Sequence, residues 1–267
     1  MKDATQKIYL VGEGWGYECA LKGLQLVYED IIGMSSLDCS VRGAVIVFDG
    51  YKPIVPHDVI VGNTCINVHY SLLPKYRGLH STVWAILNDE DYIGLSVHIM
   101  TDNIDEGPIL HQYKVKNDRI RTSREYIEFY NNYISQNLGN IIRDYLSGNT
   151  HLIPNDKDQA TWVGRRTHQD CRIDFTKDLS YQKCFFRALV DPYPLPFVEY
   201  KGDEFIVTKV DFHPRNVETH LGRILNIDED GLWVKVKDGY LIIKEIRDST
   251  NTIVDFNKFR IGQFFNR

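Results

Sequence analysis

The stretch INVHYSLLPKYRGLHSTVWAI, from Ile66 to Ile86, joins a predicted strand to a predicted helix through a polar loop. Its first half has the apolar pattern of a strand leaving a core, and its second half that of a helix beginning at Ser81. Side chains two residues apart in a strand point to the same side, so Asn67 and His69 aim at one place near the carboxyl end of the strand. An amide and a protonated imidazole both donate hydrogen bonds, and convergent donors are what a developing oxyanion requires.

A carboxylate is the group that would hold such an imidazole and accept a proton. The segment TDNIDEGPIL, residues 101–110, lies between two predicted strands and offers Asp102, Asp105 and Glu106. The plain alternative is structural: Asn67 caps a turn and His69 bonds to backbone in the core. Taken alone, the two residues favour that alternative, so the rest of the chain must decide.

Strands and helices alternate around this stretch as far as residue 146. Strands are predicted over 8–11, 41–48, 65–68, 92–100 and 109–115, and helices over 17–28, 81–87 and 125–146. This alternation is typical of an α/β domain with a mostly parallel sheet. The glycines of VGEGWGYE, residues 11–18, invite a dinucleotide-binding interpretation, but Tyr17 stands where that fingerprint needs its third glycine.

The character of the sequence changes after residue 149. A polar connector leads into a region of short apolar runs, and we predict strands over 204–212, 222–227, 232–236 and 240–246. Two pairs of these strands are joined by DEDG and KDG, which favour hairpin turns. The predicted domains are therefore a catalytic domain over 1–150, a connector with a helix over 151–190, and a β-rich subdomain over 191–267.

Composition sets the outer bounds on function. Of the 267 residues, 43% are hydrophobic and 25% are charged, which is ordinary for a globular protein, and the formal net charge of −5 argues against a large nucleic-acid footprint. The five cysteines are scattered and form no C-x-x-C, and the nine histidines have no metal-ligand spacing. No signal peptide or bilayer-spanning run is recognisable. We expect a cytoplasmic protein with no metal, no nucleic acid and no membrane partner.

The segments NVHYSLLPKYRG, WAI, GLSVH and DEGPI occur in one order and spacing. Together they resemble the folate-dependent formyltransferases, a family with a Rossmann-like catalytic domain. The resemblance implies 10-formyltetrahydrofolate as co-substrate and Asn67, His69 and Asp105 as the catalytic set. It also places the FDGYKPIVPHDVI segment, residues 48–60, beside the folate. The implied folate-binding residues are Tyr51, Lys52, Ile54, Asp102 and Ile104.

Two further segments bear on the acceptor. RRTHQDCRIDF, residues 165–175, and RALVDPYPLPFVEY, residues 187–200, look like stretches of the sugar-nucleotide branch of this family. This resemblance implies a nucleotide-linked amino sugar, carried by dTDP and bearing its amine at carbon 3 or 4. The candidate substrate-binding residues are Lys75, Arg77, Trp84, Arg165, Arg166 and Tyr193. Lys75 would meet the diphosphate as a point charge, whereas Arg77 fits either a phosphate contact or a structural pair with Asp105 or Glu106.

The sequence departs from the family pattern at Leu79 and His168, which stand at positions often held by a basic residue and a proline. Neither change touches the implied catalytic set. Two alternatives stay open: a methionyl-tRNA formyltransferase, and a non-catalytic protein that binds folate or a nucleotide sugar on the same fold. The apolar hairpins of the tail and the long helix over 125–146 also lead us to expect a symmetric homodimer.

Overall fold

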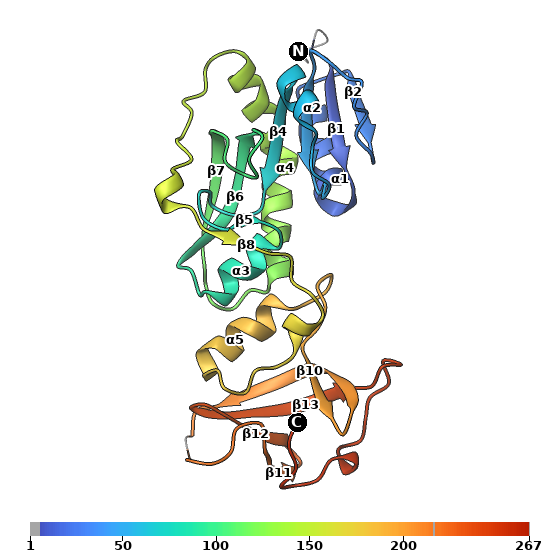
Figure 1. The fold of residues 1–267 in the computed structure, drawn as a ribbon, viewed down its shortest axis with the longest axis vertical. Coiled ribbons are helices and arrows are strands. Elements are labelled where there is room, and N and C mark those ends of the chain that lie inside the picture. The colour runs from blue at the N-terminus through green and yellow to red at the C-terminus, as the bar shows by residue number, and fades with distance from the viewer. Residues whose placement is uncertain (1–5, 216, 267) are drawn as a thin grey trace. The chain divides into compact units, whose positions relative to one another are not determined.

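The computed structural model describes residues 6–215 and 217–266. Within these residues the chain forms two compact units. The first holds the described residues up to 85 together with 90–118 and 125–165, and the second holds 86–89, 119–124 and the described residues from 166 onward. We describe each unit by itself (Figure 1).

A six-stranded sheet in the order β2-β1-β3-β4-β6-β7 forms the centre of the first unit. The pairings of β1 with β2 and β3, and of β3 with β4, are parallel, whereas β4 with β6 and β6 with β7 are antiparallel. β4 is therefore the strand at which the sheet changes direction. The strands are β1 (Ile8–Gly12), β2 (Ile31–Met34), β3 (Val45–Asp49), β4 (Thr64–His69), β6 (Tyr92–Ile99) and β7 (Ile109–Lys116); β5 (Arg77–Gly78) and β8 (Trp162–Val163) form a separate two-stranded sheet.

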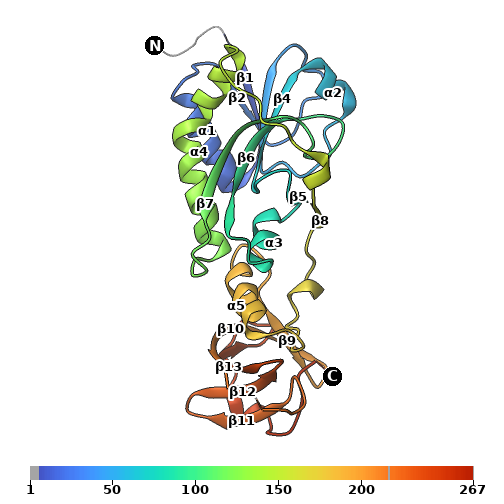
Figure 2. The same ribbon diagram turned by 90° about the vertical axis from the view of Figure 1, so that its left-hand side faces the viewer.

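The helices of the N-terminal half connect these strands. They are α1 (Gly14–Gln25), α2 (His57–Gly62), α3 (Ser81–Leu87) and α4 (Ser123–Leu146), followed by the short 3-10 helix at Lys157–Gln159. α1 and α4 lie side by side along the same face of the sheet (Figures 1 and 2), and their backbones approach closely at two glycines. A Cβ on Gly23 would lie 2.3 Å from the carbonyl oxygen of Ile134, and a Cβ on Gly139 would lie 2.6 Å from that of Gly23. Only glycine fits at this crossing.

The second unit is built on a five-stranded antiparallel sheet in the order β11-β12-β13-β10-β9. Its strands are β9 (Phe197–Tyr200), β10 (Asp203–His213), β11 (Ile224–Asp228), β12 (Gly231–Val236) and β13 (Gly239–Arg247). Helix α5 (Leu179–Ala188) precedes them, and 3-10 turns lie at Gln169–Cys171 and Phe256–Lys258. An α/β sheet that is mostly parallel, followed by a β-rich part, confirms the predicted fold class.

The predicted bounds of some elements of the first unit differ from those in the structure. The strand predicted over 41–48 begins only at Val45, because the N–H of Gly43 bonds to the carbonyl of Gly62 and ends the preceding loop there. The helix predicted over 17–28 begins earlier and covers 14–25. β2 and α2 were not predicted, since four and six residues are too short to show a clear period.

Candidate active site

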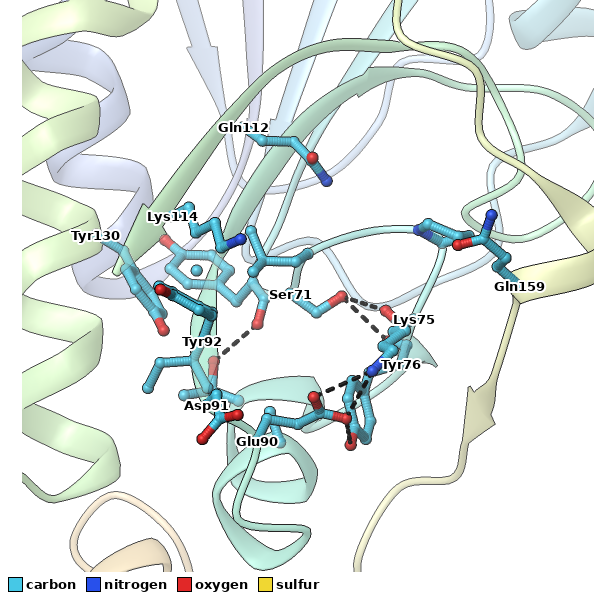
Figure 3. A pocket seen from close by; sticks show the side chains of 17 residues that line it. Ser71, Lys75, Tyr76, Glu90, Asp91, Tyr92, Gln112, Lys114, Tyr130 and Gln159 are labelled. Atoms are coloured by element: carbon cyan, nitrogen blue, oxygen red, sulfur yellow. Dashed lines mark hydrogen bonds and ion pairs between the residues drawn. The ribbon is translucent and has the colours of Figure 1, made fainter. Parts of the chain in front are cut away.

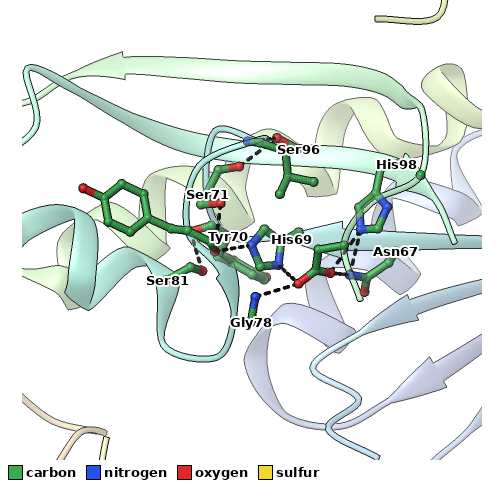
Figure 4. A network of polar contacts seen from close by, with 12 residues as sticks. Asn67, His69, Tyr70, Ser71, Gly78, Ser81, Ser96 and His98 are labelled. Carbon is green, nitrogen blue, oxygen red and sulfur yellow. Dashed lines mark hydrogen bonds and ion pairs between the residues drawn. The ribbon is translucent and has the colours of Figure 1, made fainter. Parts of the chain in front are cut away.

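The two polar residues of β4 lie on the same side of the strand, near its carboxyl end. Asn67 pairs with Phe48 of β3 on one side and with His98 of β6 on the other. His69, the last residue of β4, is buried and pairs with Ser96. Figure 4 shows Asn67, His69 and His98 turned toward one another. The sheet therefore fixes the backbone of both predicted donors through hydrogen-bonded neighbours.

Asp105 completes this cluster from the loop between β6 and β7. Its Oδ2 accepts from the backbone N–H of Gly78 at 2.8 Å and lies 3.5 Å from Nδ1 of His69. Its Oδ1 accepts from Nδ2 of Asn67 at 3.5 Å and lies 3.4 Å from Nε2 of His98. Asp105 has φ 54°, a left-handed conformation that is uncommon outside glycine and recurs at functional sites. The predicted catalytic residues are thus brought together.

The charges of this cluster are set by burial and by its own contacts. Burial would raise the pKa of Asp105, but His69 and His98, together with the N–H of Gly78, outweigh it and lower that pKa to about 2. Burial lowers the pKa of His69, against the opposing effect of Asp105 and of the Tyr76 carbonyl. The Nε2 of His69 bonds to that carbonyl at 2.9 Å, so this nitrogen carries a proton. The cluster holds a carboxylate beside two imidazoles.

His98 belongs to the cluster, although sequence reasoning assigned it no role. It is 1% exposed, and its Nδ1 lies 2.8 Å from the backbone oxygen of Ile99. Its Nε2 lies 3.2 Å from Nδ2 of Asn67. The segment GLSVH was recognised as part of the family pattern, but only the register of β4 and β6 reveals that its histidine faces Asn67.

The loop that leaves His69 is fixed to the segment after α4. Gly78 has φ 104°, and a Cβ there would lie 2.2 Å from the carbonyl oxygen of Val163, so β5 and β8 can pair only with glycine at this position. Arg77 is fully buried; its guanidinium binds Glu106 at 3.0 Å and the Asn155 side chain at 2.8 Å. Arg77 therefore makes the structural pair with Glu106 that the sequence left open as one of its two roles.

Lys75 is exposed in the same loop and forms an ion pair with Glu90 at 3.0 Å. It lines a cavity of about 430 Å³ together with aromatic residues including Tyr76, Tyr92 and Tyr130 (Figure 3). Asn67, His69 and Asp105 do not line this cavity. The cavity is therefore separate from the cluster of Asn67, His69 and Asp105, although both lie beside the loop that follows His69.

The residues predicted to bind folate lie in two loops of the first unit. Ile54 and Ile104 are 74% and 57% exposed, which is unusual for isoleucine. Tyr51 packs on Phe48 with ring centroids 5.5 Å apart, and Lys52 lies 3.8 Å from Glu13. The two loops are joined, because Nδ1 of His57 at the start of α2 lies 2.6 Å from Oδ1 of the exposed Asp102.

The remaining residues predicted to bind the substrate differ in their exposure and in their hydrogen-bond partners. In the first unit, Trp84 donates through Nε1 to the carbonyl of Gly164 at 2.9 Å, and Arg165 is exposed. In the second unit, Arg166 is buried and donates to the carbonyl of Asp170, and burial raises the pKa of the half-buried Tyr193 to about 12. The guanidinium of Arg166 is thus engaged within its own unit.

A second buried carboxyl was missed by the sequence. Asp49, the last residue of β3, is 0% exposed, and Tyr70 donates a hydrogen bond to its Oδ1 at 3.1 Å. Burial raises its pKa to about 7, against the opposing effect of that hydrogen bond. A lone aspartate after a buried run such as VIVF has no spacing partner in the sequence.

The described residues also bear on metal binding and on membrane spanning. Across 6–215 and 217–266, no three or more His, Cys, Asp and Glu side chains are grouped so that they could hold a metal ion. Over the same residues, no helix has the length and apolar character needed to cross a membrane.

Comparison with known proteins bears on the family. A model described as formyl transferase matches residues 39–132, and a model described as formyl transferase, C-terminal domain, matches residues 165–263. Together they match more than half of the chain. The chain belongs to the formyl transferase family. The first match contains Asn67, His69, His98 and Asp105, and the family resemblance read from the sequence is confirmed.

The proteins that this chain resembles have names with different acceptors. A methionyl-tRNA formyltransferase of Borrelia turicatae is 32% identical over 204 residues, which are 74% of this chain and 64% of the relative. The chain therefore spans less than two thirds of that relative's length. Solved structures share the fold: an N-formyltransferase from Helicobacter canadensis in complex with folinic acid and dTDP-3-aminofucose (TM-score 0.69, 17% identity, 89% of this chain and 98% of that one) and a methionyl-tRNA formyltransferase from Clostridium thermocellum (TM-score 0.63, 19% identity, 77% and 92%).

Proposed function

We propose that this protein transfers a formyl group from 10-formyltetrahydrofolate to the amine of a nucleotide-linked amino sugar. The observation that carries the proposal is the cluster at the end of β4, where an amide, an imidazole and a carboxylate from segments 38 residues apart converge. A binding protein has no need of all three groups in one place. Membership of the formyl transferase family supports a transferase.

Each member of the cluster has a defined task in this reaction. When 10-formyltetrahydrofolate is bound, it supplies the formyl carbon, which exchanges its bond to the folate nitrogen for a bond to the acceptor amine. Asn67 donates an N–H to the formyl oxygen, where negative charge develops. Asp105 is a carboxylate at neutral pH and accepts the proton that the amine loses. Neutral His69 keeps its hydrogen on Nε2, toward Tyr76, so its Nδ1 can take this proton from Asp105. Once charged, His69 stabilises the oxyanion and returns the proton toward the departing folate nitrogen.

The residues proposed to bind the folate fit a flat, partly apolar ligand. Ile54 and Ile104 expose most of their side chains on the two loops that His57 and Asp102 join. A pteridine ring between these loops would remove apolar surface from water at about 25 cal/mol per Å². Tyr51, Lys52 and Asp102 supply the polar groups at the edge of this site.

The charge of the second unit favours a small acceptor over a polynucleotide. Between 166 and 267, Lys and Arg equal Asp and Glu in number. Several of these cations already have acidic partners: Lys209 binds Glu245 at 2.7 Å, and Lys244 lies 3.3 Å from both Asp211 and Asp230. A protein that binds a tRNA releases counterions through a large surplus of cations. Residues 166–267 have no such surplus, and the stretches 86–89 and 119–124 of this unit add only three arginines and one aspartate.

Among the proposed substrate contacts, the exposed cations are the candidates for the diphosphate. Lys75 and Arg165 are exposed, whereas Arg77 and Arg166 are buried with partners of their own. Within the first unit, we assign Lys75 and Arg165 to the diphosphate, and Trp84 to the base or sugar, whose flat faces suit an aromatic side chain.

A second candidate acceptor is methionyl-tRNA, which the names of the curated relatives favour. The chemistry at Asn67, His69 and Asp105 would be the same, and only the acceptor would change. The charge argument above weighs against this acceptor, so the choice needs an experiment that offers both.

The test is a competition between acceptors. Purified protein with 10-formyltetrahydrofolate is offered dTDP-, UDP- and GDP-linked amino sugars and, in parallel, methionyl-tRNA, and products are read by mass spectrometry. We expect the mass of one formyl group to appear on an amino sugar, with a dTDP-3- or 4-amino sugar as the best substrate. Formylation of methionyl-tRNA alone would establish the second candidate, and no product from either would overturn the proposal of formyl transfer.

A further inference from the structure

The histidine of β6 touches both the amide and the carboxylate of the cluster. Nε2 of His98 lies 3.2 Å from Nδ2 of Asn67 and 3.4 Å from Oδ1 of Asp105. Asn67 and His98 face each other directly across β4 and β6, so the sheet holds this distance. His98 is 1% exposed and does not reach a substrate from there. Its action must pass through its neighbours.

The proton on one nitrogen of His98 is fixed by the backbone. Its Nδ1 lies 2.8 Å from the carbonyl oxygen of Ile99, which only accepts, so Nδ1 carries a hydrogen in every protonation state. In neutral His98, Nε2 is therefore bare and can only accept. It then takes a hydrogen bond from Nδ2 of Asn67, whose amide nitrogen also faces Asp105. With the amide nitrogen engaged inside the cluster, its oxygen is the end that is left for a substrate.

A proton on Nε2 reverses this arrangement. Protonated His98 donates from Nε2, which suits the Asp105 carboxylate and the oxygen of the Asn67 amide but not its nitrogen. A half-turn of the amide about its last bond places the oxygen against His98 and the nitrogen outward. Only this second orientation offers the formyl oxygen a donor.

We propose that His98 is a positioning residue whose protonation turns the amide nitrogen of Asn67 toward the reacting formyl oxygen. The titratable groups that the structure places against it are Asp105, whose Oδ1 lies 3.4 Å from Nε2, and His69, whose ring centroid lies 6.4 Å away. Its neighbour on β7 is the apolar Ile109. The proposal rests on the proposed function for its kinetic consequences, but the orientation of Asn67 can be observed in the absence of substrates.

Two substitutions at this position separate the roles. In His98→Gln, the side-chain amide nitrogen takes the place of Nε2 and donates at every pH. In His98→Asn, the shorter chain reaches only the Nδ1 position and leaves the Asn67 amide without a partner. We expect His98→Gln to keep kcat near the wild-type value at low pH and to lose the wild-type fall in kcat as pH rises. We expect His98→Asn to lower kcat by roughly 10- to 100-fold at every pH, part of the cost of losing an oxyanion donor.

The control and the readouts keep this test specific. His111→Gln removes another histidine of the sheet, a half-buried one that bonds to Tyr133 at 2.6 Å, and should keep the wild-type profile. The KM values of both substrates should stay within about threefold in all three variants, because none of these side chains is assigned to binding. A wild-type fall in kcat retained by His98→Gln would overturn the proposal, and so would a rise in KM without a loss of kcat in His98→Asn.

A second measurement needs no turnover. In ¹⁵N spectra of the free protein, we expect neutral His98 to carry its hydrogen on Nδ1, and the side-chain NH₂ signals of Asn67 to shift with the same midpoint as His98. Signals are assigned from Asn67→Ala and His98→Gln, and the shift should be absent in His98→Gln. Asn67 signals that ignore the proton on His98 would refute the inference even if formyl transfer is established. A coupled shift would support it even if the acceptor or reaction proves different.

Discussion

Two buried carboxyls of the first unit, Asp105 and Asp49, differ in the state in which the fold holds them. Asp105 is surrounded by His69, His98, the amide of Asn67 and a backbone N–H, and its pKa falls to about 2. Asp49 is fully buried, with the hydroxyl of Tyr70 as its hydrogen-bond donor, and its pKa rises to about 7. Burial acts on both in the same direction, so the partners decide the outcome.

The two carboxyls therefore differ in charge at neutral pH, and only Asp105 lies in the proposed catalytic cluster. Asp105 is ionised at neutral pH, and its charge is stabilised beside His69, to which we propose that it passes a proton. Asp49, with a pKa of about 7, takes up its charge only near the same pH, and ionising it lowers the free energy of unfolding. Substitutions of the two aspartates and of the residues around them test this difference.

The largest effect is expected from removing the amide on the Asp105 side. Asn67→Ala should lower kcat by on the order of 10²–10³-fold, the usual cost of one oxyanion donor, with KM values nearly unchanged. The matched control is Asn131→Ala, since the Asn131 amide lies 2.8 Å from the hydroxyl of Tyr70 beside Asp49. Steady-state kinetics should find this control within about threefold of wild type. Equal losses of kcat in Asn67→Ala and Asn131→Ala would contradict a special role of the Asp105 cluster in the reaction.

The second effect concerns stability and pH on the Asp49 side. Its folded pKa lies above the value of 3.8 for an ordinary aspartate, so the folded state retains the proton as pH rises. The stability contribution is complete below pH 3.8, is lost between there and about pH 7, and is constant above. The loss is on the order of 4 kcal/mol. Asp49→Asn should remove this slope.

Urea unfolding of wild type and Asp49→Asn between pH 4 and 8 measures this pH dependence of the unfolding free energy. Their difference in unfolding free energy should grow with pH, in favour of Asp49→Asn. Asp105 has the opposite sign, because its lowered pKa gives stability above pH 3.8 that is lost only as pH falls toward 2. A difference that shrinks with pH would show that Asp49 is charged in the folded protein.

The third effect tests the role of the buried Arg77 beside the Asp105 loop. Arg77→Leu should lower the free energy of unfolding by about 1.5–3 kcal/mol, the usual loss of a hydrogen bond with a charged partner, since it abandons Glu106 and Asn155. Thermal or urea unfolding measures this change. Lys75→Ala, in the same loop but exposed, is the control and should be near wild type. An Arg77→Leu protein with unchanged stability and a raised KM for the acceptor would show that Arg77 binds the substrate instead.

The smallest effect is expected at Lys75 itself. If its ammonium leaves Glu90 to meet the diphosphate, Lys75→Ala should raise the KM for the nucleotide sugar about 10-fold, within the range of one charged hydrogen bond. The KM for 10-formyltetrahydrofolate should hardly move. Comparable increases in both constants, or in neither, would remove Lys75 from the diphosphate site.

Much of the first unit could be predicted because its signals are local. The strand ending in Asn67 and His69, and the helix over Ser81–Leu87, follow from apolar spacing and a serine at the helix start. The approach of Asp105 was expected from a family resemblance, since no spacing rule brings residues 38 positions apart together. The domain boundaries and the homodimer stay predictions, and light scattering at micromolar concentration checks the second.

What the sequence could not give depends on register and burial. His98 becomes a partner of Asn67 only because β6 runs antiparallel to β4 with those two residues paired. Asp49 becomes a titrating group only because β3 is covered on both faces. In the loop LPKYRG, Arg77 fits a phosphate contact or a structural pair equally well, and only its burial beside the paired β5 and β8 decides between them.

The most direct test of the account replaces each buried carboxyl by its amide and measures formyl transfer in a single turnover. Asp105→Asn and Asp49→Asn change the same atoms in the same unit, and folding of each is checked by circular dichroism. We expect formyl transfer to the best acceptor to fall by at least about 10²-fold in Asp105→Asn and to stay within about threefold of wild type in Asp49→Asn. Near-normal transfer by a folded Asp105→Asn protein would contradict it.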